Sequence, residues 1–222
     1  MADEQAHAHD EHDHEHAHGE HEHGHEHAEE EPGEELDEEA RRELEEARIE
    51  ALRRRALVQI RQYPDVALRM KAREVTEFDE ELIQLVERMQ ILMKDAQGVG
   101  LAATQLGLLR RVFVFQADEE GALEAVVNPR LVEPSEEKET DEEGCLSLPE
   151  VRVPVERSLR IVVEGKDPSG ADVRHELEGL GARVVQHEVD HLDGVLIIDR
   201  TDDEHRKEAL AVLRPQPILR GS

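Results

Sequence analysis

The sequence predicts an α+β domain in which short antiparallel sheets pack around a buried central helix carrying an H-E-x-x-H motif, with an N-terminal helix and a short C-terminal helix. Two patterns favour this class. Short β-branched segments follow one another without helical segments between them, which favours antiparallel pairing. A segment that ends near Gly194 is apolar on two sides of a helix, which is typical of a buried helix.

The first 40 residues are predicted to be a disordered, acidic, histidine-rich tail. They hold ten of the chain's 14 histidines and many carboxylates, but no Lys or Arg. So little apolar surface cannot offset the entropy lost on ordering. Residues 41–55 are charged almost all round and rich in helix formers, so we expect an exposed helical linker there. The catalytic domain is expected to occupy residues 56–222.

The charge of the chain bounds its partners. The formal net charge is −28, and both the tail and the domain are acidic, which opposes binding to a nucleic-acid backbone. No apolar run approaches the roughly 18 residues of a membrane span, and the chain has no signal-peptide pattern. The one cysteine, Cys145, cannot form an internal disulfide. We therefore expect a cytoplasmic protein with no nucleic-acid and no membrane partner.

The first helix of the domain is predicted over residues 77–96. Thr76 and Asp79 form a capping signature in front of it. Its apolar residues recur at helical spacing at Leu82, Leu85, Met89 and Leu92. A glycine-punctuated loop is expected after it, at residues 98–107.

The strands are predicted from short β-branched segments. These segments cover residues 111–116, 123–133, 151–156, 159–165 and 171–179. The sequence DPSG at residues 167–170 indicates a hairpin turn between the last two. A polar C-terminal helix is expected over about residues 203–213.

The helix with the histidines is predicted to run from about Leu180 to Leu192. His187 and His191 are four residues apart, so both side chains lie on one face and could hold one ion. Glu188 is turned partly away from that face but could reach a water bound to such an ion. Two histidines in a buried helix need partners for their ring nitrogens, and one metal ion would serve both.

The residues alone leave the third ligand open. The metzincin pattern would place a histidine at position 197, where this chain has Ile197. Glu204 and Glu208 are possible ligands, as in thermolysin-like sites, but they lie in the polar C-terminal segment. Cys145, upstream, would add a thiolate to the two imidazoles and leave a fourth position open.

Three motifs resemble the signatures of one family. In order and spacing, GVGLAATQ (98–105), EGCLSLP (143–149) and QHEVDHLDG (186–194) resemble the motifs of bacterial peptide deformylases, and QYPDVALRMKA (62–72) resembles their N-terminal segment. The resemblance spans residues 56–200. It implies a metal-dependent hydrolase that removes the formyl group from formylmethionine at the start of nascent chains near the ribosome.

The resemblance also implies the site. Cys145 would join His187 and His191 around one divalent ion, Fe(II) in the cell, with zinc, nickel or cobalt able to occupy the same site. Glu188 would be the general base. The resemblance further implies that the Gln105 amide and the Leu146 N–H stabilise the oxyanion. The backbone of the substrate would contact Val99, Gly100 and Gly144, and Arg152 would also meet the substrate. Leu180 and Val184 would form the wall of the pocket for the methionine side chain. Arg183 is expected to direct its guanidinium outward.

Two other functions are compatible with the sequence. A zinc endopeptidase of the H-E-x-x-H type would cleave internal peptide bonds and would not depend on Cys145. A metal-storage or delivery protein would use the histidine-rich tail as its functional part. Because that tail interleaves imidazoles with carboxylates, we expect it to bind additional transition-metal ions; the simpler interpretation is a solubilising polyanion.

Overall fold

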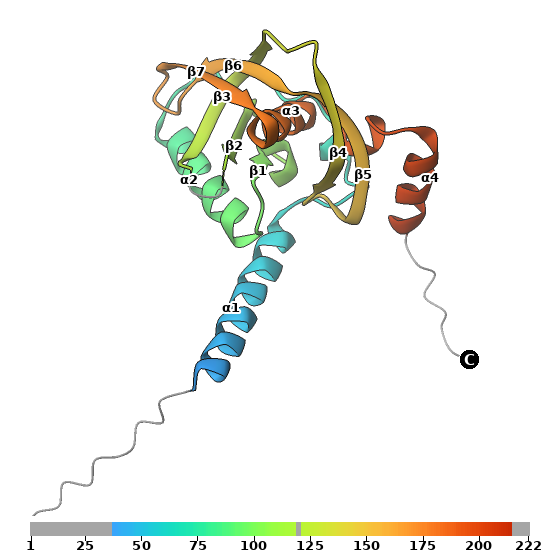
Figure 1. Cartoon of the computed structure of the whole chain (residues 1–222). Coiled ribbons are helices and arrows are strands. Elements are labelled where there is room, and N and C mark those ends of the chain that lie inside the picture. The colour runs from blue at the N-terminus through green and yellow to red at the C-terminus, as the bar shows by residue number, and fades with distance from the viewer. Residues whose placement is uncertain (1–36, 119–120, 215–222) are drawn as a thin grey trace, which may run out of the picture. The chain divides into compact units, whose positions relative to one another are not determined.

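The structure, a computed structural model, describes residues 37–118 and 121–214. The first 36 residues of the predicted 40-residue tail lie outside these ranges. The described chain contains helices and seven strands, and every strand pair is antiparallel. Figure 1 shows how they are arranged. The α+β class predicted from the sequence is confirmed.

The larger sheet has five strands in the order β1-β2-β3-β6-β7. The strands are β1 (Gly100–Ala102), β2 (Val112–Gln116), β3 (Leu123–Val132), β6 (Arg160–Lys166) and β7 (Asp172–Glu178). The predicted hairpin turn joins β6 to β7, with Gly170 in the left-handed region at φ 91°. Strand β1 falls where the sequence predicted a loop, and it forms one edge of the sheet.

The smaller sheet pairs β4 (Lys138–Cys145) with β5 (Leu148–Ser158). Strand β4 was missed from the sequence because its residues are mostly charged and exposed, so the β-branched signal is absent. The register of the pair shifts between Gly144 and Cys145, where the strands turn into each other. This irregularity places the cysteine at the tip of the hairpin.

Helix α3 (Gly179–Leu192) carries both histidines of the motif. Its apolar residues Val185, Val189 and Leu192 pack with Phe113 and Phe115 of β2 in one buried cluster. The helix also contacts β5 in the smaller sheet. Gly194 follows with φ 75°, as expected for a residue just past a helix end.

Helix α2 (Glu80–Asp95) packs on the other face of β2. Its apolar residues share a cluster with Val112 and Val114, which alternate along the strand with the phenylalanines that face α3. Asp79 is its N-cap and accepts a hydrogen bond from the N–H of Leu82. The cap is therefore Asp79 and not Thr76.

The first helix of the described residues is α1 (Glu38–Gln59), in which only Ala56 is buried. Figure 1 shows that α1 projects away from the sheets and meets the domain at its C-terminal end. It includes residues 41–55, the segment predicted to be an exposed helix; the division of the chain at residues 40 and 55 stays a prediction. The remaining elements are the 3-10 helices η1 (Val66–Arg69), η2 (Ala103–Leu106) and η3 (Ile197–Asp199), and helix α4 (Asp203–Val212).

Helix α4 packs on the hairpin side of the domain. Ala209 joins a buried cluster with Leu196 and Ile198, and with apolar residues of β5. No helix in the described part of the chain is long and apolar enough to cross a membrane.

Candidate metal centre

Three side chains converge at the tip of the β4–β5 hairpin. The Sγ of Cys145 lies 3.2 Å from Nε2 of His191, and that nitrogen lies 3.1 Å from Nε2 of His187. The candidate ligand atoms of all three residues lie within 4.8 Å of one another. The helical pitch sets the spacing of the two histidines, and the strand brings the cysteine to them from more than 40 residues away.

These three residues fit one metal ion. Tetrahedral coordination with ordinary zinc bond lengths separates two nitrogens by about 3.3 Å, and a nitrogen and a sulfur by about 3.6 Å. The separations of His191 Nε2 from the other two ligand atoms are slightly shorter than these values. Two imidazoles and a thiolate leave one position open for water or substrate. An oxygen of Glu188 beside the site is buried without a hydrogen-bond partner, as expected of a group that meets such a water.

Glu143 fixes the orientation of His187. Its Oε2 lies 3.0 Å from Nδ1 of His187, so the Nε2 of that ring is left for a metal. Arg157 donates to both carboxylate oxygens at 2.9 Å. Burial favours the neutral acid, but the hydrogen bonds from His187 and Arg157 outweigh it and lower the pKa of Glu143 to about 2. Glu143 is therefore an ionised, buried carboxylate.

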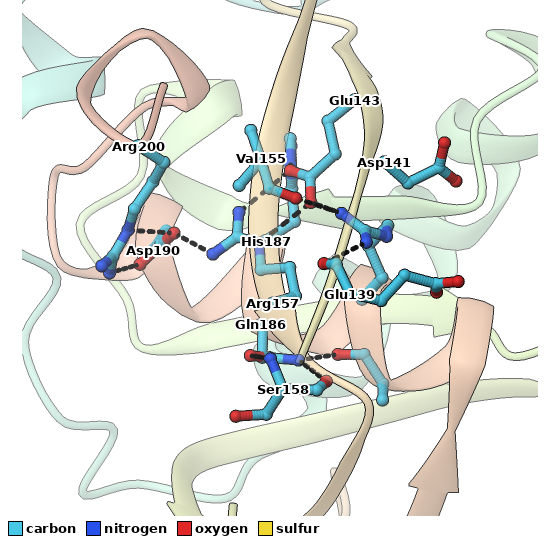
Figure 2. A network of polar contacts seen from close by, with 12 residues as sticks. Glu139, Asp141, Glu143, Val155, Arg157, Ser158, Gln186, His187, Asp190 and Arg200 are labelled. Atoms are coloured by element: carbon cyan, nitrogen blue, oxygen red, sulfur yellow. Dashed lines mark hydrogen bonds and ion pairs between the residues drawn. The ribbon is translucent and has the colours of Figure 1, made fainter. Parts of the chain in front are cut away.

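The network continues from Glu143 to Arg200, as Figure 2 shows, and the side chain of Arg200 is 48 % exposed. Arg157 also donates to Asp190, one residue before His191, and Asp190 in turn accepts from Arg200. The charges alternate in sign along this path, so each buried charge has an opposite partner. The helix that carries the histidines is thereby tied to β5 and to the segment after η3.

The expectation for Arg183 is wrong. Its guanidinium is buried and donates to Oε1 of Glu143 and to the carbonyl of Val155, each at 2.9 Å. It also donates to the carbonyl of Glu139 at 3.0 Å. The buried carboxylate of Glu143 offers a better partner than solvent would, and this partner comes from a strand that the sequence did not reveal.

Glu188 is 3 % exposed and lies against β1. A Cβ built on Gly100 would stand 2.8 Å from its Cδ, so Gly100 provides the space for this carboxylate. Burial raises the pKa of Glu188 to about 7. A carboxylate with this pKa can accept and release a proton near neutral pH.

Gln105 is buried on η2 and is held at both ends of its amide. Its Oε1 accepts from the N–H of Ala102 at 2.8 Å, and its Nε2 donates to Oγ of Ser147 at 3.1 Å and lies 3.8 Å from Sγ of Cys145. The amide is thus directed toward the candidate metal site. Ser147 was missed from the sequence, although it stands two residues after the cysteine.

A cleft of about 800 Å³ opens onto the site. Every residue predicted for the site lines it except His191, which is buried behind. Val99 and Leu180 are about half exposed at its rim, whereas Val184 is buried. Glu204 and Glu208, the alternative ligands, lie exposed on α4 and do not line the cleft.

The fold and the site define the class: an α+β protein with a cleft that ends at a candidate mononuclear metal centre. The family described as polypeptide deformylase matches residues 57–207. A peptide deformylase of Thermotoga maritima is 49 % identical over 150 residues, covering 68 % of this chain and 90 % of the relative. One of Acidothermus cellulolyticus is 48 % identical over 155 residues, covering 70 % and 84 %. The chain belongs to the polypeptide deformylase family.

Solved structures agree with this assignment. The crystal structure of the Thermotoga maritima peptide deformylase aligns with a TM-score of 0.62 at 50 % identity, covering 64 % of this chain and 96 % of that one. A Plasmodium falciparum peptide deformylase in complex with an inhibitor aligns with a TM-score of 0.64 at 35 % identity, covering 69 % and 96 %. Peptide deformylases are hydrolases that act on N-formyl peptides, and the resemblance drawn from three sequence motifs is confirmed.

Proposed function

We propose that this protein hydrolyses the formyl group from the N-terminal formylmethionine of newly synthesised proteins and releases formate. The observation that carries the proposal is the convergence of Cys145, His187 and His191 beside the unpartnered oxygen of Glu188, at the end of an open cleft. The family supports the same reaction. We further propose that it acts in the cytoplasm on nascent chains near the ribosome.

Cys145, His187 and His191 are the proposed ligands of one divalent ion. When bound, such an ion supplies a water of lowered pKa and polarises the carbonyl under attack. The thiolate makes the ligand set soft enough for Fe(II), zinc, nickel or cobalt, and affinity alone does not choose among them. We propose Fe(II) as the ion in the cell.

The protein's own groups move the proton and stabilise charge. Glu188 accepts the proton of the attacking water and then delivers it to the amine nitrogen that leaves as the C–N bond breaks. The side-chain amide of Gln105 and the N–H of Leu146 donate to the formyl oxygen as it gains negative charge. The hydrogen bond to Ser147 keeps the Gln105 amide in place for this task.

The proposed peptide lies between two sheet edges. Strand β1 ends the larger sheet and β4 belongs to a two-stranded sheet, so each has a side without a strand neighbour. We propose that the backbone of the substrate binds there at Val99, Gly100 and Gly144. The methionine side chain would contact Leu180 and Val184, and Arg152, directly opposite Gly144 in the register, would meet the substrate beyond it.

The test is formate release from formyl-Met-Ala-Ser by protein purified without oxygen and loaded with Fe(II), nickel or cobalt. The expected result is stoichiometric formate and free Met-Ala-Ser, with no cleavage inside the peptide. Acetyl-Met-Ala-Ser is the control. Internal cleavage that persists in Cys145→Ala would support the zinc endopeptidase instead, and absence of formate with every metal would overturn the proposal.

A further inference from the structure

The C-terminal end of helix α1 forms part of the cleft wall. Arg53 and Leu57 line the cleft together with Gln97 and Gly98, which precede β1. Leu57 also packs beside the buried cluster of α2, so this end of the helix is anchored to the domain. The family match begins at residue 57, so Arg53 belongs to the part of α1 that precedes the matched region.

The position of Glu188 indicates in which direction a bound peptide runs along β1. Its carboxylate lies against Gly100, so the formyl end of a substrate belongs beside this residue. Residues 101–105, which follow Gly100, are all buried, so a peptide cannot continue along the strand in that direction. On the other side, Val99 and Gln97 are exposed. The residues that follow the formylmethionine therefore leave along β1 toward Gln97 and the end of α1.

The rise per residue of an extended chain indicates which substrate residue lies near Arg53. Gln97 stands three positions before Gly100, which corresponds to about 10 Å of extended chain. With the methionine beside Gly100 as residue one, the third residue of the substrate lies two positions further, about 7 Å along the strand and beside Gly98, so its side chain reaches the Gln97 end of the cleft. Arg53 lines the same cleft, one turn before Leu57, which packs against the cluster that contains Ala96 next to Gln97.

The guanidinium of Arg53 is available to a ligand. Its side chain is 42 % exposed, and its ion pair with Glu50 is long, at 3.8 Å. The exposed charged residues that line the rest of the cleft are Glu142, Glu150 and Arg152, all from the β4–β5 sheet. Among the described residues, no ion pair joins Arg53 to either of these glutamates. Arg53 is therefore the one charge on the wall made by α1 and residues 96–100.

We propose that Arg53 determines specificity by favouring an acidic side chain at the third residue of the formylmethionyl substrate. The inference rests on the proposed function and extends it to the sequence that follows the methionine. The part of α1 that precedes the family match would thus give this enzyme a substrate preference of its own. Because the contact is exposed, its expected size is about a two- to fivefold difference in kcat/KM.

The test compares formyl-Met-Ala-Asp-amide with formyl-Met-Ala-Asn-amide, which differ in charge but hardly in shape. The C-terminal amide removes a carboxylate that would otherwise lie at the same place. We expect kcat/KM to be about two- to fivefold higher for the Asp peptide, through KM. Arg53→Gln should bring the ratio to about one, and Arg53→Glu should invert it, with kcat unchanged for the Asn peptide.

Arg54→Gln is the matched control. It removes the same charge from the next position of the helix, but Arg54 is 71 % exposed and does not line the cleft. The ratio should therefore keep its wild-type value in Arg54→Gln. Equal ratios in the wild type and in Arg53→Gln would overturn the role of Arg53 while formate release still supports the deformylase. Loss of formate from both peptides would overturn the proposed function itself.

Discussion

The α-carbon of Gly100 lies against the carboxylate of Glu188, close enough that a Cβ there would stand 2.8 Å from the carboxyl carbon. Gly100 belongs to the edge strand β1, and Glu188 belongs to helix α3, which carries two of the proposed metal ligands. The family resemblance implied another role for this glycine, namely a backbone contact to the substrate. In the structure the space is taken by the group proposed as general base, so strand and base are positioned by the same contact.

Gly100→Ala should displace Glu188 from its place. We expect kcat to fall by at least about tenfold, because a shift of about 1 Å in a catalytic group is costly. Metal content, measured by elemental analysis, should stay near one equivalent, since no proposed ligand moves. Gly144→Ala is the matched comparison: its Cβ would have 3.8 Å of room, so its effect should appear in KM. Equal kcat in Gly100→Ala and wild type would contradict the assignment of Glu188.

Glu188→Gln should lose activity but keep the metal, because Glu188 is proposed as the general base and not as a ligand. The amide has nearly the same shape and cannot accept the proton, so turnover should fall by about 10²- to 10⁴-fold. Metal content after dialysis should be unchanged, because Glu188 is not among the three converging ligands. Loss of the metal in this variant would make Glu188 a ligand and rule out its role as base.

Cys145→Ala should lose metal affinity. Two imidazoles would remain of the proposed three ligands, so dialysis against a weak chelator should remove the ion from the variant but not from the wild type. Thermal unfolding measured with and without added zinc provides a second readout: the metal-dependent rise in Tm should shrink. Full retention of metal would contradict the assignment of Cys145 as the third ligand.

Glu143→Gln should weaken both the fold and the metal site. It removes the negative charge that Arg157 and Arg183 share and leaves two buried guanidinium groups short of a partner. Removing one member of a buried ion pair destabilises a protein by about 3–5 kcal/mol. Denaturant unfolding of the metal-free protein should report this loss. Glu142→Gln, at the neighbouring exposed position, should change stability by less than about 0.5 kcal/mol.

The helices and most strands could be predicted because their patterns are local. The spacing of apolar residues gave α2 and α3 within a few residues of their observed bounds, and turn residues gave the β6–β7 hairpin. Strand β4 could not be predicted in the same way. Its pairing with β5, and not its own residues, makes it a strand.

The site residues that belong to a sequence motif could be predicted. The side chains from distant segments that contact them could not. His187 and His191 are linked by helical geometry, whereas Cys145 was one of several open candidates for the third ligand until the family resemblance selected it. Glu143 was missed as the partner of His187, although it stands two residues before Cys145 on the same strand. Arg53 could not have been found, because its position in the cleft depends on how α1 meets the domain.

The histidine-rich segment at residues 7–31 lies outside the described residues, and we propose that it binds transition-metal ions beyond the one in the cleft. Neutral imidazoles interleaved with carboxylates offer many overlapping sites for nickel or zinc. The full chain should therefore bind several more equivalents of nickel at pH 7.5 by calorimetry than a chain starting at Arg41, while both keep the same kcat once loaded. This excess should disappear near pH 5, because imidazoles with a pKa of about 6.5 protonate and no longer coordinate. A full-length chain with glutamine in place of the ten tail histidines keeps the acidic charge and should bind like the truncated chain. If it binds as much nickel as the wild type, the carboxylates alone are responsible and the histidines have no part in binding.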